Sequence, residues 1–243
     1  MTFDEPIFLK ALNKEVLKTP PIWYMRQAGR YMPEYREVRK KFKNFLEMCK
    51  HPEVCCELAL QPLHSFNLDA VILFSDILTI PDAFGLDVQF IENKGPVFRN
   101  PISEPKDIHM LDPFDPENLD YVYKAVSNIK NAIPKHVPLI GFCGSPWTLA
   151  AYSIEGKSSK EFHKTLSFLK TNESDVHSLL LKYTDACFLY LRKQVQYGAD
   201  VIQIFDSWAG LIKSNDLLNY CFKPNLKIVE FCKKKKTPVI CFP

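Results

Sequence analysis

The 243-residue sequence lacks the features that would place it in a specialised class of protein. Its net charge is only +3, from 31 Lys and Arg against 28 Asp and Glu, which is too small to predict a nucleic-acid or membrane partner. It contains no internal repeat and no low-complexity tract. With 47% hydrophobic and 24% charged residues, it has the composition of a globular protein, which excludes collagen-like, disordered and coiled-coil classes.

Signals for secretion, membrane insertion and disulfide formation are also missing. The N-terminal segment carries Asp4 and Glu5 and has no apolar core of the kind that a signal peptide requires. The eight cysteines include no C-x-x-C pair, so we expect reduced thiols in a cytosol-like compartment. The 18 uncharged residues of Val137–Ile154 are interrupted by proline and glycine, which favours a strand, a turn and a helix start over a membrane span.

Short apolar runs alternate with longer helical patterns along the chain. Runs that are apolar on both faces are typical of parallel strands covered on both sides. They are Pro21–Met25, Ala70–Phe74, Pro138–Phe142, Val201–Phe205 and Pro238–Phe242. The helical patterns are Glu34–Lys50, Pro52–Phe66, Pro116–Ile133, Glu173–Tyr197 and Asn215–Lys235. The alternation predicts an α/β protein with right-handed crossovers, and the segment Ile80–Ile102 is predicted to form an excursion or hairpin at one end of the sheet.

The number of strands leaves two architectures open. Five strands in 243 residues correspond to one strand in about 49 residues, against about 31 in a typical eight-stranded barrel. Five strands are also too few to close such a barrel. From the pattern alone, the chain is either an open five-stranded sheet or a barrel that lacks its last strands.

Polar residues stand directly after several predicted strands. Arg26 follows the first, Ser75–Asp76 the second and Asp206–Ser207 the fourth. Ligands bind at the carboxyl ends of the strands in both open α/β sheets and β/α barrels. Taken one at a time, each of these polar residues could simply be the cap of the next helix, and Tyr152 could be a core residue. Together they predict a pocket with a cationic rim and one central carboxylate.

The segment from Arg26 to Lys43 is unusually basic. A solvated basic helix is the simpler interpretation, but the first arginines follow a predicted strand directly and precede the predicted helix. Arginines also suit bidentate binding of carboxylate or phosphate better than lysines do. The segment contains two glutamates and the following cations: Arg26, Arg30, Arg36, Arg39, Lys40, Lys41 and Lys43.

Two further patterns resemble functional motifs without meeting their requirements. Glu155–Ser158 resembles the end of a phosphate-binding loop, but Ala151 stands where the first glycine is required. The residues Cys49–His51 and Cys55–Cys56 supply enough possible ligands for zinc, but their spacing matches no common structural site. We therefore predict free thiols and no metal.

Several blocks of the sequence, in the same order along the chain, resemble the signature segments of the uroporphyrinogen decarboxylase family. The blocks span nearly the whole chain, and the first is highly specific. They are residues 20–36 (PPIWYMRQAGRYMPEYR), 55–58 (CCEL), 60–62 (LQP), 74–78 (FSDIL), 141–142 (GF) with 146–149 (PWTL), and 204–210 (IFDSWAG).

The resemblance implies a fold and an activity. The fold is a (β/α)8 TIM barrel, and the activity is that of a cofactor-free carboxy-lyase that removes CO2 from the four acetate groups of uroporphyrinogen III, giving coproporphyrinogen III for haem biosynthesis. The substrate-contacting positions that it implies are Arg26, Ala28, Arg30, Arg39, Asp76, Tyr152 and Ser207. Asp76 and Arg26 would be catalytic. Members typically form homodimers, and no nucleic-acid, membrane or metal partner is implied.

The chain departs from the family pattern at its end. Family members continue beyond this point through the final strands and a late Gly-His segment, and none of the six histidines here matches that histidine. We therefore expect residues 1–243 to form one decarboxylase domain that is incomplete at its C-terminus. Two alternatives remain: a related cobalamin-associated methyltransferase barrel, which needs a zinc site where only Cys143 is suitably placed, and a non-catalytic porphyrinogen-binding fragment. The expected location is the cytoplasm, or a plastid-type organelle if a leader is missing.

Overall fold

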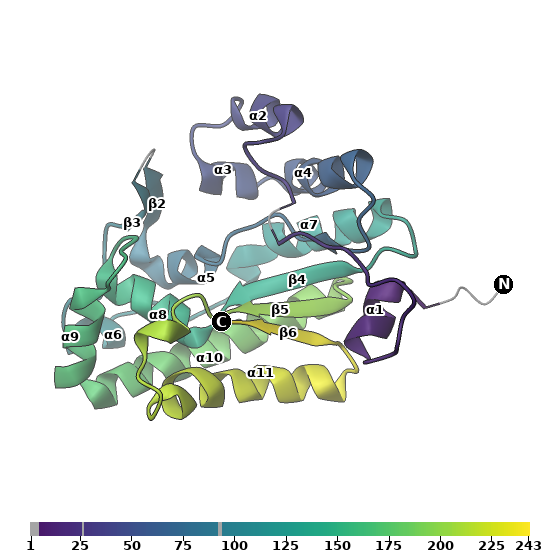
Figure 1. Cartoon of the computed structure of the whole chain (residues 1–243). Coiled ribbons are helices and arrows are strands. Elements are labelled where there is room, and N and C mark those ends of the chain that lie inside the picture. Colours follow the sequence, from purple (N-terminus) through teal and green to yellow (C-terminus); the bar gives the residue numbers. More distant parts are fainter. Residues whose placement is uncertain (1–4, 26, 92–93) are drawn as a thin grey trace.

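A computed structural model of the protein describes residues 5–25, 27–91 and 94–243. Its centre is a parallel sheet in the order β1-β4-β5-β6, formed by β1 (Val71–Ile72), β4 (Leu139–Gly144), β5 (Val201–Phe205) and β6 (Val239–Phe242) (Figure 1). In the register, Ile72 pairs with Ile140, Ile140 with Val201 and Ile202 with Val239. The predicted α/β architecture with parallel strands is confirmed.

Helices precede and connect the strands, and some of them cover the outer face of the sheet. They are α1 (Ile7–Leu12), α2 (Pro33–Arg39), α3 (Phe45–Cys49), α4 (Pro52–Ser65), α5 (Thr79–Pro81), α6 (Pro105–His109), α7 (Asp120–Ala132), α8 (Pro146–Glu155), α9 (His163–Thr171), α10 (Glu173–Gln196) and α11 (Lys223–Lys234). Short 3₁₀ or π turns occupy Asp82–Leu86, Pro116–Leu119, Ala209–Leu211 and Leu218–Phe222.

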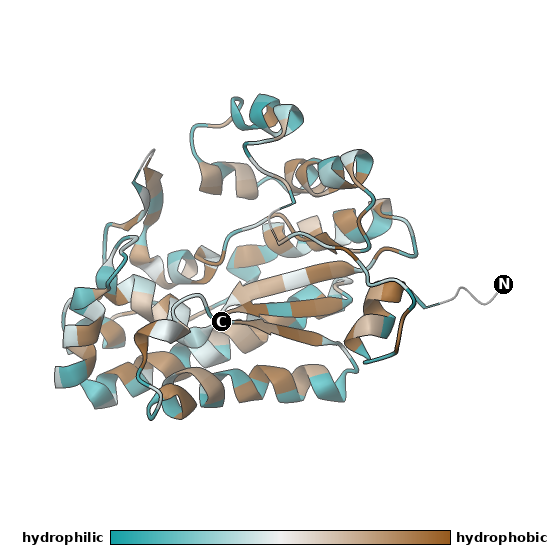
Figure 2. Ribbon diagram, in the orientation of Figure 1, coloured by the Kyte–Doolittle hydropathy of each residue, from teal (hydrophilic) through white to brown (hydrophobic). Residues whose placement is uncertain are grey.

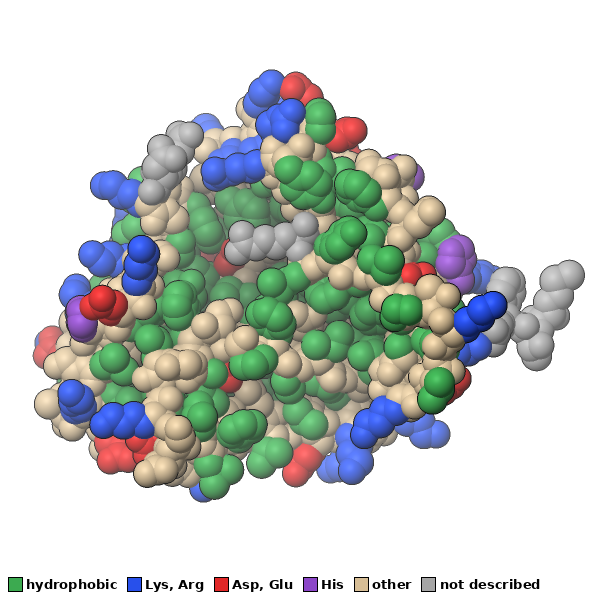
Figure 3. Space-filling view, in the orientation of Figure 1, with side chains coloured by type: hydrophobic (Ala, Val, Ile, Leu, Met, Phe, Trp, Pro, Cys, Tyr) green, Lys and Arg blue, Asp and Glu red, His purple; other side chains and the backbone are tan. Residues whose placement is uncertain are grey.

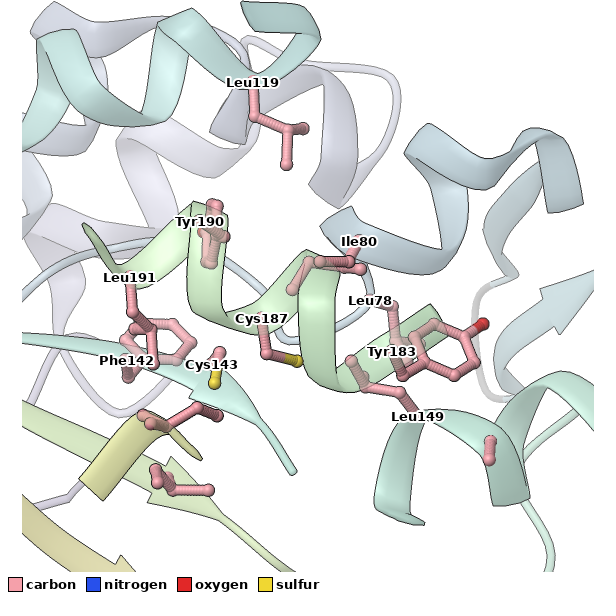
Figure 4. Packing of buried hydrophobic residues seen from close by; sticks show 14 of the residues in the cluster. Leu78, Ile80, Leu119, Phe142, Cys143, Leu149, Tyr183, Cys187, Tyr190 and Leu191 are labelled. Carbon is pink, nitrogen blue, oxygen red and sulfur yellow. The ribbon is translucent and has the colours of Figure 1, made fainter. Parts of the chain in front are cut away.

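The two faces of the sheet pack into different apolar clusters. On the outer face, Cys143 of β4 lies against Cys187 and Leu191 of α10 in the main core (Figure 4). On the inner face, Ile140 and its neighbours on β1 and β5 pack against Phe8 of α1, which lies beside the amino ends of the strands (Figure 1). The strands are accordingly mostly hydrophobic, with Gln203 of β5 as a buried polar exception, whereas the helices carry many hydrophilic residues (Figure 2).

The segment that was predicted to leave the sheet forms a hairpin. Its strands β2 (Val88–Ile91) and β3 (Gly95–Phe98) pair antiparallel. The Phe98 N–H donates to the Gly156 carbonyl at 2.8 Å, which fixes the hairpin to the end of α8. Gly156 itself ends α8 with φ of +76°, so the sequence that resembled a phosphate loop is a helix terminus.

The prediction of a strand at Pro21–Met25 is wrong. These residues belong to no sheet, so the described part of the chain forms four parallel strands instead of the predicted five. Their contact with the start of β1 is made partly by a side chain: the Ile22 N–H donates to a carboxylate oxygen of Asp69 at 2.7 Å, and the Ile22 carbonyl accepts from the Asp69 N–H at 2.9 Å. The Asp69 carboxylate thus takes the place of a backbone carbonyl as the acceptor for Ile22, and no ladder of backbone hydrogen bonds forms between residues 21–25 and β1.

Two other predicted elements are shorter than expected. Glu34–Lys50 is not one helix, because the chain breaks after α2 and restarts at α3, where the Asn44 side chain accepts from the Glu47 N–H at 2.8 Å. Ala70–Phe74 forms a ladder only at Val71 and Ile72. Val137–Ile154 divides into β4 and α8 as predicted. None of the helices in the described part of the chain has the length and apolarity needed to cross a bilayer.

Candidate active site

A cavity of about 1460 Å³ lies at the carboxyl ends of the strands. Its walls come from the strand ends of the sheet, from the β2–β3 hairpin and from residues 27–45, which include α2. Figure 3 shows this hollow, with hydrophobic side chains on its walls and basic side chains along its rim. Segments that are far apart in the sequence therefore build one site, at the end of the sheet where the sequence predicted it.

The walls of the cavity next to the sheet are aromatic. Phe205 lies edge-to-face with Phe142 at a ring-centre distance of 5.4 Å and with Phe242 at 6.2 Å. These three rings come from β4, β5 and β6. Phe205 is paired with Phe242 in the register, and Phe142 lies two residues before the β4 partner of Phe205, on the same face of the sheet. On the other side, Phe45 packs on Phe74 at 5.6 Å and so joins α3 to the end of β1. A ligand in this cavity meets flat apolar surfaces on at least two sides.

The rim of the cavity is cationic. Its described lining contains four basic side chains, Arg30, Arg39, Lys40 and Lys43, and a single acidic one, Asp76. Arg30 is exposed, whereas Arg39 is half-buried and donates from Nη1 to the Phe42 carbonyl at 2.7 Å. This hydrogen bond uses one of the five guanidinium donors and orients the group. The net positive lining favours an anionic ligand.

Asp76 lies four residues beyond the β1 ladder, at the wall of the cavity. Its Oδ1 accepts from the Leu78 N–H at 2.8 Å, and its carbonyl accepts from the Thr79 hydroxyl at 3.1 Å. These bonds form a turn just before α5, whose N-cap residue is Leu78 and has no side-chain cap, so Asp76 is not the helix cap that we considered as its alternative. The Oδ1 bond holds the carboxylate at the cavity wall, where the sequence predicted it.

Ser207 is presented to the cavity by a buried polar cluster beneath it. The carboxylate of Asp206 is buried and accepts from the hydroxyls of Ser145 and, at 3.2 Å, of Thr148. Burial is the main cause that raises the pKa of Asp206 above its ordinary value, and the hydrogen bonds oppose that rise. Ser207 is exposed and lines the cavity. Asp206 therefore holds the buried hydrogen bonds, and Ser207 presents its side chain to a ligand.

Tyr152 reaches the cavity from α8. It is half-buried, with its ring 5.7 Å from that of Phe162 and 5.8 Å from that of Trp208, both edge-to-face. The aromatic packing that was the alternative for this residue is therefore present as well. The packing holds the ring while the side chain lines the cavity.

The cavity brings together six of the seven predicted site residues: Ala28, Arg30, Arg39, Asp76, Tyr152 and Ser207. The seventh, Arg26, lies outside the described residues. The sequence did not single out Lys40 and Lys43 of the rim, although both belong to the basic segment, or the hairpin residues Phe90 and Pro96. The hairpin carries no chemical signal in the sequence, because its contribution to the cavity is only its shape.

The cysteines that resembled zinc ligands are packed thiols. Cys55 lies in α4 and donates from Sγ to the Cys49 carbonyl at 3.4 Å, and burial raises its pKa to about 12. All eight cysteines are free. Among the residues that the structure describes, no three His, Cys, Asp or Glu side chains lie together as they would around a metal ion.

Comparison with known proteins shows the family of the chain. The family model described as "Uroporphyrinogen decarboxylase (URO-D)" matches residues 4–243. The chain belongs to the uroporphyrinogen decarboxylase family. A protein named uroporphyrinogen decarboxylase from Francisella tularensis subsp. mediasiatica is 48% identical over 239 residues, which cover 97% of this chain and 69% of the relative. One of the same name from Legionella pneumophila is 46% identical over 242 residues, covering 98% and 69%.

A solved structure has a similar fold. A methyltransferase from Methanosarcina mazei matches with a TM-score of 0.74 at 20% sequence identity, and the match covers 98% of this chain and 69% of that one. At this identity, the likeness concerns the fold alone. It confirms the expected barrel-type fold of the uroporphyrinogen decarboxylase family, of which the described residues form four parallel strands.

Proposed function

We propose that this cavity binds uroporphyrinogen III and that the protein removes CO2 from its four acetate groups, giving coproporphyrinogen III. One observation carries the proposal: an aromatic cavity rimmed by four basic side chains contains a single described carboxylate, Asp76. This combination suits a large apolar ring system with acidic groups around its edge. It suits a neutral or a cationic ligand poorly.

The size of the cavity supports a ligand of this class. Most small-molecule pockets have volumes of about 300–1,000 Å³, and this one is larger, at about 1460 Å³. The pyrrole rings of the substrate would lie against Phe142 and Phe205, and its carboxylates would meet Arg30 and Arg39 at the rim. Guanidinium groups bind carboxylates through paired hydrogen bonds, so the arginines would also orient the substrate.

The reaction needs a place for the electron pair that CO2 leaves behind. A proton added to a ring carbon of one pyrrole makes an iminium-like cation. The bond between the acetate methylene and its carboxylate then breaks, and its electrons neutralise that cation. Addition of a proton to the methylene carbon and loss of the ring proton give a methyl group, so each CO2 released consumes one proton. The substrate itself is the electron sink, and no separate cofactor is required.

Asp76 would stabilise this cation. Its carboxylate would accept hydrogen bonds from pyrrole N–H groups and would interact more strongly with the charged ring than with the neutral one, which lowers the barrier. Arg26 is our candidate for assisting proton delivery, Tyr152 and Ser207 for binding an acetate, and Ala28 for backing the substrate. In this proposal Asp76 carries most of the rate, and the arginines most of the affinity.

Anaerobic incubation of the protein with uroporphyrinogen III tests the proposal. The expected products are coproporphyrinogen III, detected after oxidation by chromatography, and CO2, with no added metal or cofactor. Binding without turnover would favour the non-catalytic alternative. Bound zinc together with methyl transfer to a thiol would favour the methyltransferase alternative.

We also propose that the protein is a homodimer in the cytoplasm. This rests on its family, whose members typically pair with their clefts facing each other. Light scattering coupled to size-exclusion chromatography measures the mass directly. A mass of one chain across the accessible concentration range would contradict the dimer.

A further inference from the structure

Strand β1 has one paired edge and one edge that faces away from the sheet. On the paired edge, the Val71 and Leu73 N–H groups donate to the Pro138 and Ile140 carbonyls at 3.0 and 2.9 Å. Because backbone groups alternate along a strand, the Ala70 carbonyl and the Ile72 N–H point the other way. No β-strand lies along that side in the described part of the chain.

The side chain of Gln27 takes the place of the missing strand. Its Nε2 donates to the Ala70 carbonyl at 2.8 Å, and its Oε1 accepts from the Ile72 N–H at 3.1 Å. Gln27 is only 3% exposed, so both hydrogen bonds are shielded from water. A primary amide presents an acceptor and a donor side by side, as a peptide group does, and one glutamine therefore completes the ladder at two backbone positions.

Gln27 is also the first described residue of the loop that forms the basic rim. The Tyr31 hydroxyl donates to the Gln27 carbonyl, and the Met32 N–H donates to the Gly29 carbonyl at 2.9 Å. The Arg36 guanidinium donates to the Arg30 carbonyl at 2.8 Å. These bonds stiffen residues 27–32 into one unit, but in the described structure only Gln27 bonds this unit directly to β1.

We propose that Gln27 is a positioning residue: its amide docks the loop carrying Ala28 and Arg30 onto β1 and so sets the position of this loop relative to Asp76. The inference rests on the proposed function, because it assigns the loop and Asp76 to one substrate. The start of β1 and the basic loop come from segments 43 residues apart, and the amide joins them by hydrogen bonds. Farther along, Tyr35 of α2 packs on Phe74 at a ring-centre distance of 6.1 Å, a contact that does not include the loop itself. Without these hydrogen bonds, the loop and the end of β1 each keep their own structure, but the loop is displaced relative to Asp76.

A second buried glutamine provides a matched control. Gln194 of α10 accepts from the Phe142 N–H and donates to the Phe142 carbonyl, both at 2.9 Å. Its Oε1 would lie 2.4 Å from a Cβ at Gly141, so a glycine is needed beside it. Gln194 makes the same pair of bonds to a strand as Gln27 does, but it belongs to a helix and not to the basic loop.

The first test is Gln27→Leu, which nearly keeps the volume and removes both hydrogen bonds. We expect hydrogen exchange to rise in peptides that span β1 and residues 27–36. We also expect the affinity for uroporphyrinogen III, measured anaerobically by calorimetry, to fall about tenfold. Gln194→Leu should lower the melting temperature without raising exchange in residues 27–36 more than elsewhere. Unchanged exchange and affinity in Gln27→Leu would overturn the inference.

The second test uses the variant Gln27→Glu, which still decides the role of Gln27 if Gln27→Leu does not fold. In Gln27→Glu, a carboxylate would face the Ala70 carbonyl and repel it. The protonated acid would instead donate to that carbonyl and accept from the Ile72 N–H, as the amide does. Protection of residues 27–36 should therefore return as the pH falls toward the ordinary glutamate pKa of about 4.3, or at a higher pH because the site is buried.

Wild type and Gln194→Glu control for other titrating groups. Wild type should show no gain of protection in residues 27–36 over the same pH range. Gln194→Glu should gain stability as the pH falls, without a gain specific to this loop. A Gln27→Glu profile that parallels either control would overturn the inference. If wild type binds no uroporphyrinogen III, the proposed function fails, and the exchange measurements alone decide whether Gln27 docks the loop.

Discussion

The two sides of the cavity are built in different ways. On the sheet side, strands β4 and β5 are joined by a backbone ladder, and residues such as Cys143 and Ile204 are fully buried in the main core. The rim side rests on a small separate cluster. Its buried members are Met32, Tyr35, Val38, Met48 and Leu58. Its loops are held by side chains that donate to backbone carbonyls, as Arg36 and Arg39 do.

The difference follows from what each side presents to a ligand. An apolar wall can be part of the protein core, since packing it there stabilises the fold. A row of cations cannot be buried in that way, because desolvating unpaired charges costs far more than packing returns. The charged side is therefore a peripheral layer with its own small core, and it needs specific hydrogen bonds to keep it in place. Four predictions test this division, from the largest expected effect to the smallest.

The largest effect is expected at Asp76, the single carboxylate in the described lining of the cavity. Asp76→Asn keeps the acceptor for the Leu78 N–H but removes the charge that would stabilise the pyrrole cation. Turnover of uroporphyrinogen III should fall about 10²–10³-fold while the melting temperature stays close to that of wild type. Asp69→Asn, at the amino end of the same strand, is the control and should retain the wild-type rate. A wild-type rate in Asp76→Asn refutes the role.

The next effect concerns the two cores. Leu191 and Met48 are both fully buried, the first in the main core and the second in the rim cluster. Each change to alanine should cost about 2–5 kcal/mol locally. Leu191→Ala should lower the global melting temperature, whereas Met48→Ala should mainly raise hydrogen exchange in α2 and α3.

Equal loss of protection throughout the molecule in both variants would show that the rim is not a separate cooperative unit. The two sides of the cavity would then unfold as one unit.

A smaller effect is expected at the rim arginines. Arg39→Met should weaken binding of uroporphyrinogen III about tenfold, because it removes an oriented, half-buried donor. Arg30→Met should weaken it less, since the side chain is exposed and its charge is screened. Both differences should shrink as salt is added. Arg99→Met provides the control: Arg99 pairs with Asp87 outside the cavity lining, so the affinity should not change.

The smallest effect is a pH dependence of stability on the sheet side. Burial raises the pKa of Asp206 above 3.8, so the folded state binds its proton more tightly than the unfolded state does. Its contribution to stability is therefore greatest below pH 3.8 and is lost as the pH rises through the folded pKa. The Asp206→Asn variant does not titrate there. The melting temperature of the variant, relative to that of wild type, should therefore rise as the pH increases from 3.8. A difference that stays constant with pH would contradict this.

Much of the sheet side was predictable from the sequence, because its signals are local. The run Val201–Phe205 is apolar on both faces and is a strand with those bounds, and the polar pair that follows it divides between the buried cluster and the cavity. Asp76 and Ser207 could be selected since strand-end positions converge in any parallel α/β fold. The position of a residue in its own strand was enough.

The rim side was less predictable, because distant partners decide its structure. Residues 21–25 have the composition of a strand, but side-chain groups of Asp69 and Gln27 occupy backbone sites of this region that a ladder would use. The helical pattern of Glu34–Lys50 gives no warning of the break that Asn44 caps. In both places a side-chain hydrogen bond replaces a backbone one, and residue propensity does not report that exchange.

The sequence by itself determined the alternation of strands and helices, the family, and which end of the sheet carries the chemistry, since periodicity and motif order are properties of neighbouring residues. Only the tertiary structure decided that the basic loop, the hairpin and the strand ends enclose one cavity. It also decided that a buried amide docks the loop to β1, across 43 residues of chain. Contacts of that range depend on how the layers pack, and packing is resolved only when the whole chain has folded.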